Sequence, residues 1–274
     1  MSIKISTYIS TINALFFQST LEQTIRQSLL FSDEIIVVNS EYSSDGTQNL
    51  LDDLHSEYPN QIKIYSFKED YNVRHGKLAD KKTFALKKCA GDYCILQDDD
   101  ECIHEKYADY IRQLPEICPD TLAFRFNTIH FYRSYNHYQT GNDWYKNKIY
   151  MVKNIPEIKH GRVINDCDNH IIYDKNLKDY VPLDSLIPPH VINTPITSYH
   201  YGWARNDCIL LIKKYFQEIR WHGKDYWNKN KFPFRFDKPE TLEKFSGTHP
   251  YHMRSLIEKE TKYPKMRLEK FDMI

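Results

Sequence analysis

The fold is decided by the stretch EIIVVNSEYSSDGT, residues 34–47. Its first part, residues 34–38, is an almost continuous apolar and β-branched run, typical of a strand buried on both faces of a parallel sheet. The run ends in a turn, residues 43–47, whose Ser and Asp side chains are natural helix caps. Leucines at the spacing of a helix face follow. The stretch therefore predicts a strand, a turn and a helix in succession.

The same alternation of strand and helix extends through the first hundred residues. Periodicity predicts further strands at residues 3–10, 62–65 and 93–96, and further helices at 21–29 and 78–88. This order favours an α/β fold, a doubly wound and mostly parallel central sheet flanked by helices with right-handed crossovers. Ligands of such sheets bind at the carboxyl ends of the strands. We therefore expect the site at those ends.

The second half of the chain changes character. Two strands are predicted at residues 121–130 and 148–153, followed by an irregular, Pro-containing stretch at 154–195. A short strand at 197–201 and a helix at 206–220 come after it. We expect one domain over residues 1–205, with a C-terminal helical or irregular extension, residues 206–274, packed on it. The segment FSGTHP, residues 245–250, is either a lid over an acceptor or a simple turn.

Composition narrows the classes of function. Lys plus Arg and Asp plus Glu both total 37, so the formal net charge is zero. A neutral chain has no long-range field to gather nucleic acid or an acidic membrane. Aromatic residues make up 14% of the chain, including 21 Tyr, and they serve equally well in an irregular core or against a sugar or base. Nucleic acid is therefore not an expected partner.

The cysteine pattern and the hydropathy favour a cytoplasmic protein. The six cysteines form no Cys-x-x-Cys pair, which argues against a structural zinc site. Reduced and mostly buried thiols are the simplest interpretation. The N-terminus runs directly into a predicted strand, so no secretory signal is expected, and no apolar run reaches 18 residues, so no transmembrane segment is predicted.

An acidic run, Asp98 to Glu101, directly follows the predicted strand at 93–96. Four adjacent carboxylates repel one another unless a cation or solvent compensates. Asp98 and Asp100 project together from an extended turn, which gives magnesium or manganese hard oxygen ligands beside a diphosphate. The alternative is a solvated acidic loop near a helix N-terminus. The position directly after a buried strand favours the metal.

Together, the stretch at 34–47 and the apolar strand ending in Asp-x-Asp-Glu resemble the family 2 type of inverting glycosyltransferases, whose Rossmann-like fold is called GT-A. The resemblance covers about the first 105 residues and, more weakly, 195–205. The chain departs from the family pattern at Asn39, where the family usually has Asp, and its loop is one residue longer. Neutral Asn39 accepts and donates hydrogen bonds, so it leaves the nucleotide preference open.

The resemblance implies a nucleotide-sugar site and a divalent metal, manganese or magnesium. For the UDP- or GDP-linked donor the implied residues come from the strand ends, the early turn, the helix before the acidic strand and the late strand: Thr7, Tyr8, Asn39, Glu41, Asp45, Lys77, Lys82, Asp98, Asp99, Trp203 and Arg205. The implied metal ligands are Asp98, Asp100 and His200, the last because related enzymes return a late-strand His to the metal. A diphosphate also needs cationic donors, although either Lys alone fits a solvated helix face equally well.

An inverting transferase needs a carboxylate that deprotonates the acceptor hydroxyl. The family often has a Val-His-Glu-like triplet after the middle strands, and Asp166 falls where that Glu would be. Asp168 is its neighbouring alternative, Glu101 is the second catalytic candidate, and Asp99 is a further one. Asp166 is equally compatible with a turn.

The sequence thus predicts a metal-dependent glycosyltransferase, a hexosyl- or pentosyltransferase that acts with inversion on an unspecified acceptor. The first alternative is a nucleotidyltransferase, which should open with a Gly-rich phosphate loop, whereas residues 5–17 contain no Gly. The second is a metal-dependent phosphatase or nuclease, which should scatter several His and Asp ligands over strand ends. A sugar-binding module without activity explains the aromatic residues but not the turn at 34–47.

Overall fold

The computed structural model describes residues 3–69, 77–142, 144–163, 166–222 and 241–262. Its α-helices are α1 Leu21–Ser28, α2 Thr47–Glu57, α3 Lys77–Leu86, α4 Ala108–Ile117, α5 Asp207–His222 and α7 Arg254–Lys262. Short 3-10 helices lie at Glu105–Tyr107, Leu183–Ser185 and Tyr251–Met253. Among the described residues, none of the helices combines the length and hydrophobicity that a bilayer crossing requires.

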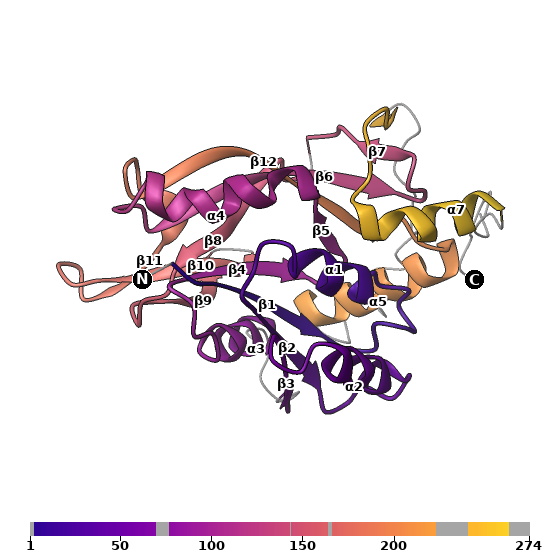
Figure 1. The fold of residues 1–274 in the computed structure, drawn as a ribbon, viewed down its shortest axis with the longest axis horizontal. Helices are drawn as coiled ribbons and strands as arrows, with labels where there is room; N and C mark the ends of the chain where they lie inside the picture. Colours follow the sequence, from indigo (N-terminus) through magenta and orange to yellow (C-terminus); the bar gives the residue numbers. More distant parts are fainter. Residues whose placement is uncertain (1–2, 70–76, 143, 164–165, 223–240, 263–274) are drawn as a thin grey trace.

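The strands form one large sheet and one small one (Figure 1). The large sheet contains β1 Ile5–Thr11, β2 Glu34–Ser40, β3 Ile62–Phe67, β4 Tyr93–Asp98, β5 Glu101–Ile103, β6 Ala123–Tyr132, β7 His137–Gln139, β8 Asn147–Lys153, β12 Val191–Trp203 and β13 Leu242–Lys244. The small sheet contains β9 Ile158–Val163, β10 Asp166–Asp174 and β11 Asp179–Pro182, in the order β11-β10-β9.

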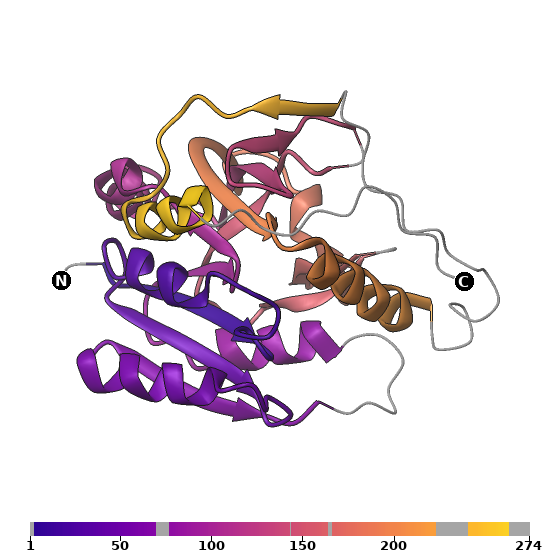
Figure 2. The same ribbon diagram turned by 90° about the vertical axis from the view of Figure 1, so that its right-hand side faces the viewer.

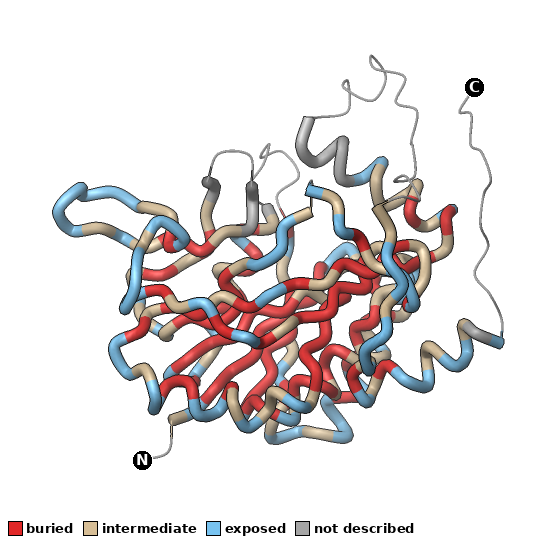
Figure 3. The backbone as a smooth tube through the Cα atoms, turned by 90° about the horizontal axis from the view of Figure 1, so that it is seen from above, coloured by how far each residue is buried: buried red, intermediate tan, exposed pale blue. Residues whose placement is uncertain are grey.

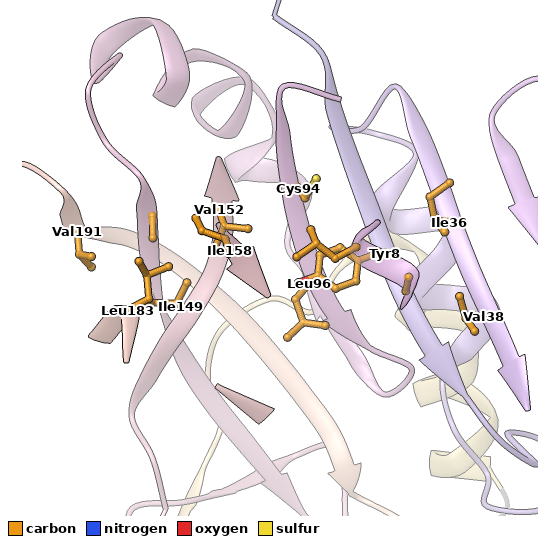
Figure 4. Close-up of a cluster of buried hydrophobic side chains, with 13 residues drawn as sticks. Tyr8, Ile36, Val38, Cys94, Leu96, Ile149, Val152, Ile158, Leu183 and Val191 are labelled. Carbon is orange, nitrogen blue, oxygen red and sulfur yellow. The ribbon is translucent and has the colours of Figure 1, made fainter. Parts of the chain in front are cut away.

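The first half of the chain builds a parallel sheet in the order β3-β2-β1-β4. Every residue of β1 and β2 is buried, as a strand covered on both faces requires. Ile35 and Val37 pack against α1 and α2 on one face. Ile36 and Val38 point to the other face, where α3 and the small sheet cover them (Figure 4). The mostly parallel sheet with flanking helices confirms the fold class predicted from the sequence.

The core continues into the second half of the sheet. β8 runs antiparallel to β4 and to β6, and α4 covers the same face as α1 and α2 through a cluster that includes Tyr93, Phe124 and Tyr150. Figure 3 shows the buried backbone concentrated in the central strands, with exposed residues in the outer turns. The acidic run therefore lies at the edge of a core that extends to both sides of it.

One expectation for the second half is wrong, and one is confirmed with bounds that were too narrow. The stretch 154–195 is not irregular, because it forms the small sheet and the start of β12. The strand expected at 197–201 is present as part of the much longer β12. Pro195 falls where the register of β12 against β6 shifts, between Asn193 and Thr197, so the strand continues through the proline at an irregularity in its pairing.

The segment FSGTHP, residues 245–250, packs against β12 and the aromatic rings around it. His249 Nδ1 is 2.9 Å from the hydroxyl of Tyr201, and its ring packs among aromatic rings that include Phe131 and Phe245. The following residues lie against α1 (Figure 2), where Tyr251 donates its backbone N–H to Glu105. The division of the chain at residue 205 stays a prediction.

Candidate donor and metal site

The acidic loop, residues 98–101, begins at the last residue of β4, at the carboxyl edge of the parallel sheet. β1 lies beside β4 and ends at the same level. The hydroxyl of Thr11 donates to Asp99 Oδ2 at 2.5 Å, and the hydroxyl of Ser19 donates to the Asp99 carbonyl at 2.5 Å. These two bonds hold Asp99, in the middle of the loop, against the end of β1 and the residues that follow it. Asp98 and Asp100, on either side of Asp99 in the sequence, have different partners.

Two lysines neutralise Asp98 on the first side of the loop. Lys82 Nζ lies 2.7 Å from Oδ1, and Lys148 Nζ lies 3.0 Å from Oδ2. Lys148 Nζ also lies 2.8 Å from Oε1 of Glu101, to which the Tyr150 hydroxyl donates at 2.9 Å. Glu101 has no exposed surface, and Lys82 is 1% exposed. This side of the loop is a network of ion pairs that is buried at Glu101 and Lys82 and partly exposed at Asp98.

Asp100 faces the second half of the chain. Its Oδ2 accepts from the Arg205 guanidinium at 2.5 Å and from Lys213 Nζ at 3.1 Å. Its Oδ1 lies 3.4 Å from His200 Nε2. Gly202 allows this approach, because a Cβ there would collide with Asp100 Oδ2 and His200 Nε2. A carboxylate oxygen and an imidazole nitrogen therefore face each other, while both cations lie against the other oxygen of the same carboxylate.

The path of β12 explains how residues a hundred positions apart in the sequence meet. β12 pairs antiparallel with β5, where His200 lies opposite Glu101, and parallel with β6, where His200 lies opposite His130. The chain then turns into α5, which brings Lys213 back over the loop. The site therefore requires β12 to be paired on both of its sides, with β5 and with β6.

A second histidine lies behind His200. His130 Nδ1 is 2.7 Å from His200 Nδ1, and His130 Nε2 is 2.7 Å from the carbonyl oxygen of Tyr145. His130 is 2% exposed. Burial, and then the nearby charge of His200, lower the pKa of His130 to about 3. His130 is therefore a neutral imidazole in the folded protein at neutral pH.

The charges of the loop are set by these neighbours. Burial raises the pKa of Asp98, but the ammonium groups of its two lysines outweigh that effect and hold its pKa below the usual range. Burial likewise raises the pKa of Asp100, and the cations around it bring the pKa well below the usual range. The pKa of Asp99 is raised to about 6 by burial and by the neighbouring charge of Asp100. Asp98 and Asp100 are thus ionised at neutral pH.

Asp100 and His200 offer a donor set that fits manganese or magnesium, one carboxylate oxygen and one imidazole nitrogen. Both oxygens of Asp98 are occupied by lysines, so Asp98 contributes less readily. Over the described part of the chain, no group of three His, Cys, Asp or Glu side chains is spaced to hold a metal alone. This is compatible with such an ion, since magnesium is commonly held by one or two carboxylates together with water and substrate phosphates.

The turn after β2 lies at the same edge of the sheet. Asn39 is 2% exposed, and its Oδ1 accepts from the hydroxyl of Ser43 at 2.7 Å. Asp45 directly precedes Gly46, the N-cap residue of α2, and its Oδ1 accepts from the backbone amide of Thr47 at 3.0 Å, while Oδ2 accepts from the amide of Phe16 at 2.6 Å. Glu41 is exposed. The turn therefore combines a buried amide, a carboxylate bonded to the start of α2 and an open carboxylate.

Other predicted residues lie away from this edge or outside the described side chains. Thr7 and Tyr8 have no exposed surface, so they belong to the core, and we do not carry them into the proposed site. Lys77 begins α3 and Asp166 begins β10, but the side chains of both, like that of Asp168, lie outside the described residues.

Trp203, at the end of β12, belongs to an aromatic group beside His200. Its ring stacks on Tyr132 with ring centroids 6.4 Å apart and meets Trp144 edge-on at 5.6 Å. Lys213 Nζ lies 5.1 Å from the centroid of the Trp203 ring. Lys213, one of the two cations that pair with Asp100, therefore also contacts this aromatic group.

The sequence reasoning missed Lys148, Tyr150, Lys213 and His130. The first three carried no readable signal, because a lysine or tyrosine in a strand or helix of this composition is ordinary. His130 had one: the segments TIHFY, residues 128–132, and SYHYG, residues 198–202, each place a His two residues after a hydroxyl side chain. In the parallel pairing of β6 and β12 these positions lie opposite each other.

Comparison with known proteins gives a family match. The model of glycosyl transferase family 2 matches residues 2–181. No curated protein matches the chain. Among solved structures, S. aureus TarS 1–349 in complex with UDP-GlcNAc is 17% identical over 46% of this chain and 35% of that chain, with a TM-score of 0.35. Mannosyltransferase PcManGT from Pyrobaculum calidifontis, in complex with GDP-Man and Mn²⁺, is 11% identical over 95% of this chain and 69% of that chain, with a TM-score of 0.49.

Proposed function

Because the chain belongs to glycosyl transferase family 2, we propose that it moves a hexose or pentose from a UDP- or GDP-linked donor to an acceptor hydroxyl, with inversion and with a divalent metal. The observation that carries the metal is the pair Asp100 and His200, 3.4 Å apart at the carboxyl edge of the sheet. The family match favours this function over a nucleotidyltransferase, a phosphatase or a nuclease.

Arg205 and Lys213 are the residues we assign to the donor diphosphate. Both cations lie against Asp100 Oδ2 and therefore beside the proposed metal position. A guanidinium and an ammonium group are the usual partners of phosphate oxygens. A bound manganese or magnesium would neutralise charge on the departing diphosphate as a Lewis acid. The two cations would share that negative charge and orient the leaving group.

Asp98 and Glu101 have a different part in this proposal. Lys82 and Lys148 hold Asp98 in place, and Glu101 is fully buried beneath it with three donors around its carboxylate. We assign Glu101 to shaping the loop, because a group with no exposed surface cannot reach an acceptor hydroxyl. Asp98 keeps 28% of its side-chain surface exposed, which leaves it available to a ribose hydroxyl or a water on the metal.

The catalytic base is proposed to be Asp166, with its neighbour Asp168 as the alternative. The base must take the acceptor proton as the hydroxyl attacks the anomeric carbon, and a carboxylate whose conjugate acid has a pKa near the working pH does this best. Among the described carboxyls of the loop, Asp99 has its pKa raised to about 6, which suits that task. Its carboxylate, however, already accepts from Thr11. We therefore keep Asp166 as the first assignment.

Calorimetry with UDP, GDP and their sugars, with and without manganese, tests the proposal. We expect nucleotide binding that strengthens with metal in the wild-type protein and loses that metal effect in Asp100→Ala. The matched control is Asp109→Ala, which removes an exposed carboxylate from α4. Slow hydrolysis of one nucleotide sugar in a donor screen would identify the donor without an acceptor. Absence of any nucleotide binding by the folded wild-type protein would overturn the proposal.

A further inference from the structure

The structure holds a chain of three hydrogen-bonding groups behind the proposed metal position. It runs from the Tyr145 carbonyl through His130 to His200, with both contacts at 2.7 Å, and ends at His200 Nε2, 3.4 Å from Asp100 Oδ1. His130 and His200 lie opposite each other on the parallel strands β6 and β12. The two rings are nearly perpendicular, with an interplanar angle of 88°.

The positions of the protons along this chain follow from what each atom is able to do. The Tyr145 carbonyl only accepts, so His130 Nε2 must carry a hydrogen. His130 is 2% exposed, and burial favours a neutral ring, whose other nitrogen then has a lone pair. His130 Nδ1 is therefore an acceptor, and His200 Nδ1 must donate to it. In neutral His200 this leaves the lone pair on Nε2, 3.4 Å from Asp100 Oδ1. That carboxylate oxygen also only accepts, so the two atoms turn lone pairs toward each other, as two ligands of one cation do.

We propose that His130 is a positioning residue that fixes the tautomer and the orientation of His200, so that His200 Nε2 presents its lone pair beside Asp100 for a divalent cation. This inference rests on the metal site of the proposed function and adds to it a residue that contacts neither the metal nor the donor. The hydrogen bond made by one ring nitrogen of a His decides which state the other adopts. Partners of this kind orient metal-binding His side chains and raise their basicity.

The packing around His130 fits a fixed ring. Trp144 lies with its ring centroid 4.9 Å from that of His130, and Tyr145 lies edge-on at 4.4 Å. The partner of His130 Nε2 is a backbone carbonyl, which cannot switch from acceptor to donor. The donor and acceptor roles in this series of hydrogen bonds are thus set at its buried end, the Tyr145 carbonyl, and determine the state of the nitrogen that faces Asp100.

The first test is the ¹⁵N NMR spectrum of the metal-free protein with labelled His, recorded at alkaline pH, where imidazole rings are neutral. We expect His200 to carry its hydrogen on Nδ1 in the wild-type protein. His130→Phe removes the acceptor and should shift His200 to the other tautomer or to a mixture. His130→Asn places an amide oxygen near the position of Nδ1 and should keep the wild-type tautomer. The control His190→Phe alters an exposed His.

The second test is manganese binding by the same four proteins, followed by electron paramagnetic resonance. We expect His130→Phe to weaken binding by roughly 10- to 100-fold, the range for loss of such a partner. His130→Asn should recover most of that loss, and His190→Phe should match the wild type. Near-UV circular dichroism confirms that each variant is folded.

The outcomes separate this inference from the proposed function. His200 protonated on Nε2 in the neutral wild-type protein overturns the inference, as does unchanged manganese affinity in His130→Phe. If the tautomers are as expected but the wild-type protein does not bind manganese, the proposed function loses its metal. The role assigned to His130 is then wrong as well. Expected tautomers and the graded loss of affinity support both.

Discussion

The two sides of the acidic loop hold their carboxylates in different ways. Asp98 lies between Lys82 and Lys148 and has a counter-charge on each oxygen. Asp100 has both of its cations on Oδ2, while its Oδ1 faces an imidazole nitrogen. One carboxylate is saturated by the protein, and the other retains an oxygen directed at a potential metal ligand. Two aspartates separated by a single residue therefore serve different purposes, which the spacing Asp-x-Asp alone does not reveal.

The largest effect should come from Asp100→Asn. Removing this carboxylate deletes a proposed metal ligand, and Lewis-acid assistance of several kcal/mol at about 1.4 kcal/mol per tenfold predicts a loss of about 10³-fold in transfer rate. The rate with a donor identified by hydrolysis screening provides the measurement. The loss should exceed that of Asp98→Asn, assayed at a temperature where both are folded. If Asp100→Asn still transfers the sugar at the wild-type rate without added metal, Asp100 is not a metal ligand, and the proposed difference between Asp98 and Asp100 is wrong.

Asp98→Asn should act mainly on stability. It leaves Lys82, which is 1% exposed, facing a neutral group, and breaking a fully buried pair costs about 3–5 kcal/mol. Asp98 itself is 28% exposed, so we expect a smaller loss, about 2 kcal/mol in the free energy of unfolding. Urea denaturation measures it. The double variant Asp98→Asn with Lys82→Met should regain part of the loss, and a double variant that is less stable than the single one would contradict this account.

The two sides should also lose stability in different ranges of pH. Burial lowers the pKa of His130 to about 3, so the folded protein does not bind the proton that the unfolded chain takes up near pH 6.5. Stability should therefore fall as the pH drops from about 6.5 towards 3, by up to about 1.4 kcal/mol per pH unit from this group. The pKa of Asp98 is lowered, so its contribution is present above about pH 4 and is lost only below it.

Urea denaturation between pH 7 and pH 4.5 separates these contributions. His130→Phe should flatten the dependence over this range, whereas Asp98→Asn should lower stability by a similar amount at every pH within it. Other buried histidines, such as His249 with its pKa lowered by burial to about 4, contribute in the same direction, so some slope remains. Equal slopes for His130→Phe and the wild type would show that His130 is protonated when folded.

The smallest effect should come from Asn39→Asp, in the nucleotide turn. Asn39 Nδ2 donates to Gln48 Oε1 at 3.0 Å, and Gln48 Nε2 donates to Asp52 at 2.8 Å. A rotated Gln48 amide can donate to the new carboxylate by giving up its bond to Asp52, so we expect a loss of about 1 kcal/mol in stability. The relative affinity for UDP and GDP should change, measured by calorimetry, while manganese affinity stays the same. A large change in manganese affinity would mean that the turn and the Asp100 side are not independent.

Much of the first half of the molecule could be predicted from the sequence, because its signals are local. The parallel strands read as apolar runs and the helices as leucine periodicity within ten or so residues, so β2, α2 and β4 are found where expected. Five prolines between residues 154 and 195 obscured the small sheet and most of β12. A strand that continues past Pro195 at a shift of register gives no periodic signal of its own.

The site was predicted in part for the same reason. Asp98, Asp100, His200 and Arg205 carry signals of position or resemblance, and the structure brings them together. Lys148 and Lys213 join them only through the pairing of β8 with β4 and the turn from β12 into α5. Their chemistry depends on tertiary neighbours, which propensity and spacing do not encode.

The long path of β12 has a consequence for how the protein is made. During synthesis the four carboxylates of residues 98–101 leave the ribosome before Lys148, and long before Arg205 and Lys213. Until β12 has paired with β6, the negative charges of the loop lack half of the cations that surround them in the finished fold. Pairing between distant segments is also intrinsically slow. The nascent chain therefore carries a partly uncompensated acidic turn for much of its elongation, and it completes its charge balance and its site in the same late step.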